Sequence, residues 1–196
     1  MATFTKQKTA KIISILFIPQ TFTIFVIPFL AFKYELLSSQ RWAAIIIALT
    51  FGFILQIFTY FYIIKKKNIR SFDETNSAER TIPYLAQIIL YVTGLFLLLY
   101  FDVTYLIIVF WFTYIVNCFV LVLINYKWKI SSHSIGVAQN FALFVFLSNP
   151  VYWILIPIVL VISLARIELK VHDKYQIIGG LALGFILTYW QLYILL

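Results

Sequence analysis

The sequence predicts an all-α, polytopic transmembrane helical bundle with about six to seven spans. Of its 196 residues, 63% are hydrophobic and only 11% are charged. Several apolar runs approach the length of about 20 residues that an α-helix needs to cross about 30 Å of hydrocarbon. The runs lack the alternation of polar and apolar residues that a membrane barrel requires. We therefore expect helices, which satisfy their own backbone hydrogen bonds in the bilayer.

The apolar runs divide the chain into seven candidate spans. The first follows a basic segment like that of a signal peptide, but it continues to Phe32 without a small-residue cleavage site, so we interpret it as a retained span. The fifth is short. Because sixteen helical residues reach only about 24 Å, it is expected to begin near Ile130 or to stay partly within the protein. The expected spans are residues 11–33, 43–64, 82–101, 103–126, 134–149, 150–165 and 177–196.

The whole chain, residues 1–196, is expected to form a single integral membrane domain. With seven spans, the N-terminus and the loops at residues 65–81, 127–133 and 166–174 lie on one face and carry thirteen of the fifteen Lys and Arg residues. Such a basic face is expected to be cytoplasmic, in the inner or plasma membrane of the cell. The net charge of +8 is spread over membrane-flanking loops, which argues against nucleic acid as a partner.

The two histidines of the chain, His133 and His172, both fall in these basic loops, each at the entrance to an apolar span. Taken singly, either histidine is better interpreted as an interfacial side chain at the end of a loop. Histidine also serves as an acid, base or nucleophile near neutral pH. Fixed cations, hydroxyl groups and helix N-termini bind phosphate. Convergence of three such loops over one end of the bundle would therefore create a phosphate site beside two histidines.

Two segments, ISSHS at residues 130–134 and ARIELKVHDKYQ at residues 165–176, resemble motifs of the type-2 phosphatidic acid phosphatase superfamily, whose fold is shared with vanadium haloperoxidases. That family carries Lys-six-Arg-Pro, then Pro-Ser-Gly-His, then Ser-Arg-five-His-three-Asp. The first segment has the serine and histidine of the second pattern, and the second segment has the arginine-to-histidine spacing of the third. The resemblance covers about residues 65–185 and implies a phosphatase-like core there.

The resemblance implies a role for each matching residue. His172 would attack phosphorus and form a phosphohistidine, and His133 would protonate the leaving alkoxide and then help to activate water. Gln176 falls at the position of the acid that orients the nucleophilic histidine. No metal and no cofactor is implied, and the implied partner is a lipid phosphate substrate among the membrane lipids. The expected ligands of the phosphoryl oxygens are Arg166, Arg80, Ser131 and Lys66.

The sequence departs from the family pattern at several positions. Ile130 and Ser132 replace the proline and glycine of the second pattern, and Ala165 replaces the serine of the third. Gln176 replaces the final acid. Its amide oxygen can accept a hydrogen bond from His172 and fix the tautomer, but it stabilises an imidazolium less well than a carboxylate does. Slower turnover is therefore expected.

The first family pattern has the weakest match. Arg80 is present with a displaced proline, Pro83, but Asp73 occupies the position expected for the lysine. We therefore take Lys66 as the lysine of this pattern. Every cation near it also fits a positive-inside anchor, which explains part of this basic run without any site. The alternatives to Lys66 are Lys65, Lys67 and Arg70.

Other features are interpreted as structural. Asp173 is expected to cap the last helix, and Ser131 and Ser132 fit equally well as caps of the fifth. Three glycines near the start of the last span have the small-residue spacing that permits close helix packing within a membrane bundle. These are Gly179, Gly180 and Gly184.

The sequence favours a membrane phosphatase that hydrolyses a lipid phosphate monoester or diphosphate through a phosphohistidine intermediate. One alternative is a phosphotransferase that passes the phosphoryl group to a lipid alcohol. The other is a non-catalytic transporter or scaffold whose basic loops bind anionic headgroups. The sequence leaves the oligomeric state open, and a homo-oligomer is one of the alternatives.

Overall fold

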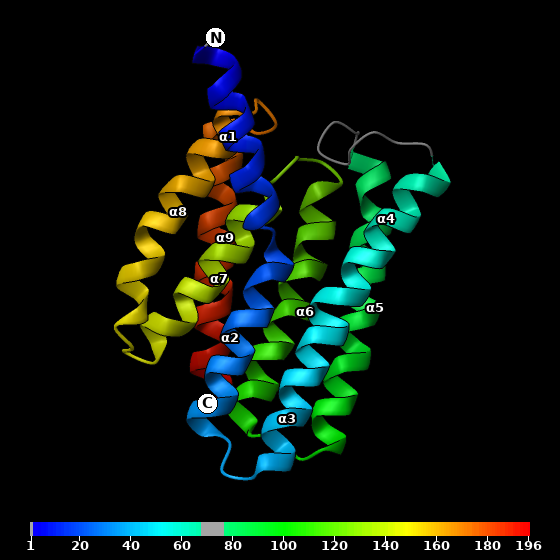
Figure 1. Cartoon of the computed structure of the whole chain (residues 1–196), viewed down its shortest axis with the longest axis vertical. Helices are drawn as coiled ribbons and strands as arrows, with labels where there is room; N and C mark the ends of the chain where they lie inside the picture. The colour runs from blue at the N-terminus through cyan, green and yellow to red at the C-terminus, as the bar shows by residue number, and fades with distance from the viewer. Residues whose placement is uncertain (1, 68–76) are drawn as a thin grey trace. The chain divides into compact units, whose positions relative to one another are not determined.

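The computed structural model describes residues 2–67 and 77–196, and all regular structure within these ranges is helical, which confirms the predicted all-α class. The helical elements of these ranges follow one another along the chain. In order they are α1 (Ala2–Leu16), α2 (Pro19–Tyr34), α3 (Ser38–Ile47), the π-helix η1 (Ala48–Ile54), α4 (Leu55–Lys67), α5 (Ser77–Tyr100), α6 (Tyr105–Asn125), α7 (Ser132–Phe146), α8 (Val151–Glu168) and α9 (Lys174–Leu195) (Figure 1).

Five helices in the described part of the chain are long and apolar enough to cross a membrane. The bent pair α1 and α2 provides a sixth if the two count as one span. The protein therefore has the helices of an integral membrane protein, at the lower end of the predicted number of spans. The five are Ser38–Lys66, Arg80–Tyr100, Tyr105–Asn125, Val151–Glu168 and Lys174–Leu195.

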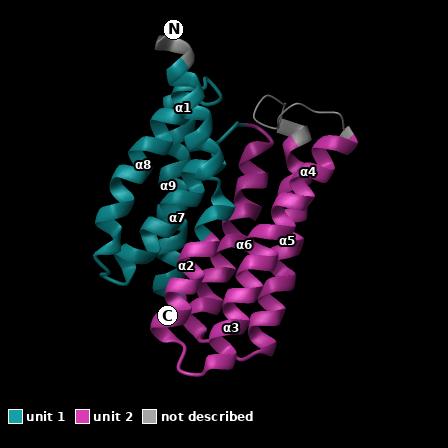
Figure 2. Ribbon diagram, viewed as in Figure 1, with its two compact units in different colours: residues 1–22, 128–194 teal, residues 23–127, 195–196 magenta. Residues whose placement is uncertain are grey.

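The chain divides into two compact units (Figure 2). Unit 1 comprises residues 1–22 and 128–194, and unit 2 comprises residues 23–127 and 195–196. Unit 1 therefore holds α1, the first turn of α2, α7, α8 and nearly all of α9. Unit 2 holds the rest of α2 and the helices from α3 to α6. The predicted phosphatase-like core, residues 65–185, draws on both units.

Helix α7 is the central helix of unit 1. It packs against α8, which also packs against α1. Two glycines bring α9 close to it, because a Cβ at Gly180 would lie 2.7 Å from the carbonyl oxygen of Ser131 and one at Gly184 would collide with the backbone of Ile135. On the same pair of helices, Phe141 stacks obliquely on Phe185 at 5.6 Å between ring centroids. The predicted close helix packing is confirmed at Gly180 and Gly184, whereas Gly179 faces the ring of Trp128.

Helix α7 is short and buried, so it does not need the length of a membrane span. Its 15 residues reach only about 22 Å, less than the hydrocarbon thickness of about 30 Å. Every residue from His133 to Phe144 is buried except Phe141. The polar side chain of Asn140 is accommodated there by a hydrogen bond, in which its Nδ2 donates to the carbonyl oxygen of Gly136 at 2.7 Å. Of the two sequence expectations for this span, the one that keeps it within the protein is correct.

In unit 2, Trp111 fills the space between two glycines on neighbouring helices. Its side chain is fully buried, and its Nε1 donates to the carbonyl oxygen of Tyr91 at 2.8 Å. A Cβ at Gly94 would lie 2.6 Å from the indole ring, and one at Gly52 would lie 3.2 Å from it. Gly52 belongs to the π-helix η1, whose wider turn interrupts the span from Ser38 to Lys66.

Three helices end in the same hydrogen-bonded turn, the Schellman motif, in which a left-handed residue follows the helix. After α8, Lys170 donates its backbone N–H to Ile167 O at 2.9 Å, and Val171 donates to Arg166 O at 3.4 Å. This turn gives the backbone between α8 and α9 a defined path, and so it contributes to the position of His172 relative to Arg166. The three left-handed residues are Asp102, Ser148 and Lys170.

Alanine at Gly184 is expected to destabilise unit 1, whereas alanine at Gly179 is not. Both substitutions favour the helix by up to about 1 kcal/mol. At Gly184 the new Cβ meets the backbone of Ile135, which cannot yield, and such overpacking costs about 1–3 kcal/mol. At Gly179 it meets the outer edge of the half-exposed Trp128 ring, which can turn aside. Thermal unfolding in detergent should show a lower Tm for Gly184→Ala alone; equal shifts in both variants would contradict the close α7–α9 contact.

Candidate functional site

The structure places the seven predicted site residues in two groups. Five of them lie in unit 1, in or next to the terminal turns of α7, α8 and α9, and two lie in unit 2. The group in unit 1 is His133, Ser131, Arg166, His172 and Gln176, and the group in unit 2 is Arg80 and Lys66.

A capping box begins α9. The Oδ1 atom of Asp173 accepts hydrogen bonds from the backbone N–H groups of Tyr175 at 2.8 Å and Gln176 at 2.9 Å. In return, the Oε1 atom of Gln176 accepts the backbone N–H of Asp173 at 3.2 Å. This reciprocal arrangement satisfies donors that a helix N-terminus leaves without partners. The prediction that Asp173 caps the last helix is confirmed.

The same side-chain oxygen of Gln176 orients His172. Its Oε1 lies 3.1 Å from Nδ1 of the imidazole. Because the backbone N–H of Asp173 can only donate, the atom it meets must be the amide oxygen, and an oxygen can bind Nδ1 only if Nδ1 carries the proton. The lone pair of neutral His172 is therefore on Nε2. The expected hydrogen bond from His172 to a glutamine oxygen is thus present.

The loop before α7 joins the start of α9. Ser131 caps α7 through its Oγ, which accepts the backbone N–H of Ser134 at 3.3 Å, so the predicted cap is confirmed. The backbone N–H of Ser131 donates to the carbonyl oxygen of Gln176 at 3.3 Å. His133 follows in the first turn of α7. Two of the three loops that we expected to converge therefore meet directly, while phosphate binding by Ser131 stays a prediction.

Arg166 and His133 meet at a residue that the sequence motifs do not include, Ser14 of α1. The guanidinium NH1 of Arg166 donates to the Ser14 hydroxyl at 2.6 Å. The Nε2 atom of His133 lies 3.0 Å from the Ser14 carbonyl oxygen and 3.4 Å from its hydroxyl. Since a carbonyl oxygen only accepts, Nε2 of His133 carries a proton. The one signal for Ser14 in the sequence is a hydroxyl within the apolar run IISIL.

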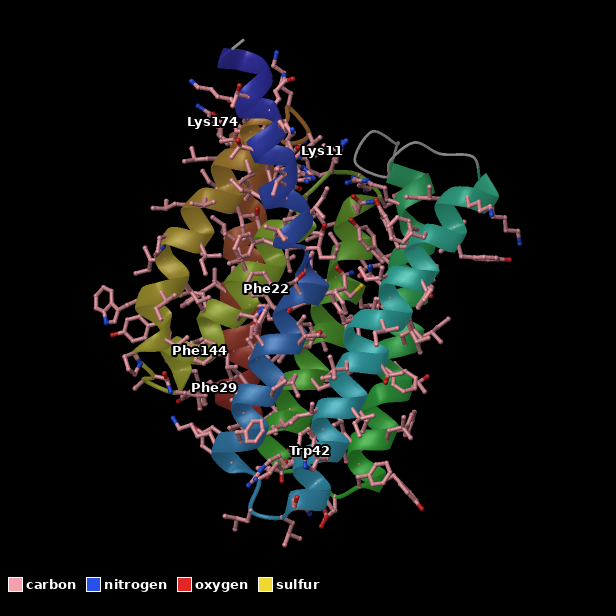
Figure 3. All side chains as sticks on the ribbon, viewed as in Figure 1. Lys11, Phe22, Phe29, Trp42, Phe144 and Lys174 are labelled. Atoms are coloured by element: carbon pink, nitrogen blue, oxygen red, sulfur yellow. The ribbon has the colours of Figure 1, made fainter. Side chains whose placement is uncertain are left out.

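The site combines buried functional groups with an exposed basic surface. Arg166 is fully buried, and the two histidines are at most 8% exposed. A buried guanidinium keeps its charge and therefore requires acceptors or an anion around it. Lys11 and Lys174 lie at the same end of unit 1, and their charges favour the approach of an anion (Figure 3). The exposed lysines of this unit are Lys6, Lys8, Lys11, Lys170 and Lys174.

The two predicted phosphate ligands of unit 2 have their own surroundings there. Arg80 is buried and donates from NH2 to Oδ1 of Asn125 at 2.5 Å, which joins the start of α5 to the end of α6. Lys66 is exposed, with its ammonium 5.8 Å from the ring centroid of Tyr62. Their role as phosphate ligands stays a prediction. Among the alternatives, Arg70 lies outside the described residues with Asp73, the side chain of Lys67 is likewise not described, and Lys65 is exposed.

No family model, curated protein or solved structure matches this chain. What the site can do chemically is therefore set by its own residues. It offers an imidazole whose Nδ1–H is held by Gln176, a buried guanidinium, and a second imidazole beside the N-terminus of α7. Together these groups suit the binding of an oxyanion and attack on it by nitrogen.

In their neutral forms, the two histidines are expected to be opposite tautomers. In protein labelled with ¹⁵N at histidine, the ring nitrogen shifts should show a protonated Nδ1 in His172 and a protonated Nε2 in His133. Gln176→Met removes the acceptor of His172, so it should alter the shifts of that ring alone, and His133 serves as the internal control. A protonated Nε2 on neutral His172 in the wild-type protein would contradict the orientation described above.

Proposed function

We propose that this protein is an integral membrane phosphatase that hydrolyses a lipid phosphate monoester or diphosphate through a phosphohistidine intermediate. The observation that carries the proposal is the orientation of His172. Its Nδ1–H is held by Gln176 at 3.1 Å, which leaves the lone pair on Nε2, the nitrogen required for attack. The resemblance of the motifs to the type-2 phosphatidic acid phosphatase superfamily supports the same chemistry.

In the first step, Nε2 of His172 attacks phosphorus while the bond from phosphorus to the lipid oxygen breaks. The departing alkoxide takes a proton from His133 in its imidazolium form. Because Nε2 of His133 is held by the Ser14 carbonyl, that proton comes from Nδ1. In the second step, water gives a proton back to His133 and attacks the phosphohistidine. The P–N bond breaks, phosphate is released, and both imidazoles return to their starting states.

Charge on the phosphoryl oxygens is stabilised in this proposal by Arg166 and by the N-terminal turn of α7. The guanidinium is fully buried, and hydrogen bonds from ionised donors are the stronger ones, especially away from water. The N-terminus of α7 adds the positive end of a helix dipole. A lipid anchored by its tail would present its phosphate at the membrane surface, where the exposed lysines of unit 1 attract it. We propose that this surface faces the cytoplasm.

Release of inorganic phosphate from a panel of lipid phosphates, measured in detergent without added metal, tests the proposal. His172→Ala should abolish release and should also abolish an acid-labile, alkali-stable phosphorylated intermediate trapped with ³²P-labelled substrate. Glu168→Gln, an exposed change on the last turn of α8, is the matched control and should keep wild-type activity. Release that survives His172→Ala would contradict a phosphohistidine mechanism.

Gln176→Glu is expected to raise kcat by about tenfold or more. The glutamate keeps the side-chain length that reaches both His172 and the backbone N–H of Asp173, and it adds the charge that stabilises an imidazolium. In serine proteases, exchanging the catalytic carboxylate for an amide costs about 10⁴ in kcat because the histidine then takes the wrong tautomer. Gln176 already accepts Nδ1–H of His172, so only the smaller contribution of the charge is expected here. No gain in Gln176→Glu would show that this charge is unimportant here.

If phosphate leaves only when a lipid alcohol is added, the enzyme is a transferase; headgroup binding without either reaction would indicate a non-catalytic role.

A further inference from the structure

The C-terminal end of α1 supplies the contact between Arg166 and His133. The last four carbonyl groups of a helix have no partner within it, and the carbonyl of Ser14 is one of these because α1 ends at Leu16. His133 donates to that carbonyl from Nε2 at 3.0 Å. The end of α1 therefore receives a donor from α7 where its own hydrogen-bonding pattern stops.

The hydroxyl of Ser14 serves a different partner from the usual one. A serine within a helix commonly donates to the carbonyl four residues earlier. Ser163 of α8 does so, with Oγ 2.7 Å from the carbonyl oxygen of Val159. Ser14 instead accepts NH1 of Arg166 at 2.6 Å, across 152 residues of sequence. Two oxygens of one residue thus hold two side chains that come from different helices.

The place of Ser14 itself is fixed by close packing within unit 1. Its side chain is only 7% exposed, and α1 packs along α8. Just beyond it, Pro19 lies against α7, where a Cβ at Gly136 would come within 2.8 Å of the Pro19 side chain. Ser14 is therefore enclosed by packed helices at the point where both partners contact it.

A guanidinium is planar, so a short hydrogen bond at one of its nitrogens restricts the plane in which its other N–H groups point. A long side chain that is ordered before the ligand arrives loses less entropy when the ligand binds. We infer that Ser14 is a positioning residue of the proposed phosphate site and sets the Arg166 guanidinium and the His133 imidazole relative to each other. The expected effect of Ser14 on catalysis rests on the proposed function. Its expected effect on anion binding rests only on the contacts of Ser14 with Arg166 and His133.

Ser14→Ala removes the hydroxyl and keeps the carbonyl, so it takes one acceptor from Arg166 while leaving the bond from His133. In metal sites, loss of a residue that orients a metal ligand typically costs about 10- to 100-fold in affinity or activity. By analogy, we expect KM for a lipid phosphate to rise by about tenfold. The change in kcat should be smaller, because the guanidinium binds the phosphoryl group in the ground state and the transition state alike. Ser14→Thr keeps a hydroxyl and should restore KM to within about threefold. Ser163→Ala is the matched control and should leave KM unchanged.

A second readout does not depend on turnover. Inorganic phosphate should raise the Tm of the purified wild-type protein and of Ser163→Ala, with a clearly smaller rise in Ser14→Ala. If phosphate has this effect while no lipid phosphate is hydrolysed, the proposed function fails and the role of Ser14 stands. If lipid phosphate is hydrolysed but Ser14→Ala keeps the wild-type KM, the role of Ser14 fails and the proposed function stands. Equal phosphate-induced shifts of Tm in all three proteins, or none in the wild type, would also overturn the inference.

Should Ser14→Ala not fold, Ser14→Cys, whose thiol is a weaker acceptor, is expected to show the same changes.

Discussion

The close approach of α9 to the first turn of α7 is the contact on which the candidate site depends. It is possible because Gly180 and Gly184 carry no Cβ at points where one would meet the backbone of α7. With the helices this close, the backbone N–H of Ser131 reaches the carbonyl oxygen of Gln176. The cap of α7 and the capping box of α9 are therefore connected by a hydrogen bond. The two histidines beside them, His133 and His172, belong to the same unit.

Gln176 shows how one side chain serves both stability and chemistry. Its Oε1 completes the capping box with Asp173 and also accepts Nδ1–H of His172. The two bonds support each other, because the backbone donor of Asp173 fixes the direction of the amide and so fixes the tautomer of His172. A glutamine at this position is therefore compatible with an ordered imidazole even though it brings no charge.

The buried charge of Arg166 constrains the rest of unit 1. A guanidinium with no exposed surface must be surrounded by acceptors, and one of them, the Ser14 hydroxyl, comes from the opposite end of the sequence. The first helix is consequently part of the site and more than a membrane anchor. The exposed lysines on α1, and at the turn from α8 to α9, place further positive charge in the same unit.

The sequence by itself determined the all-α membrane class, the cap at Asp173, the close packing at the glycines and the histidine–glutamine pair. Each of these depends on composition or on residues within a few positions of one another, where local geometry is fixed by the helix. The tertiary structure decided between the two alternatives that the sequence left for the short α7, and it alone showed that Ser14 joins Arg166 to His133. Those features depend on contacts across more than a hundred residues, which no local spacing records, because they arise only when separate helices pack together.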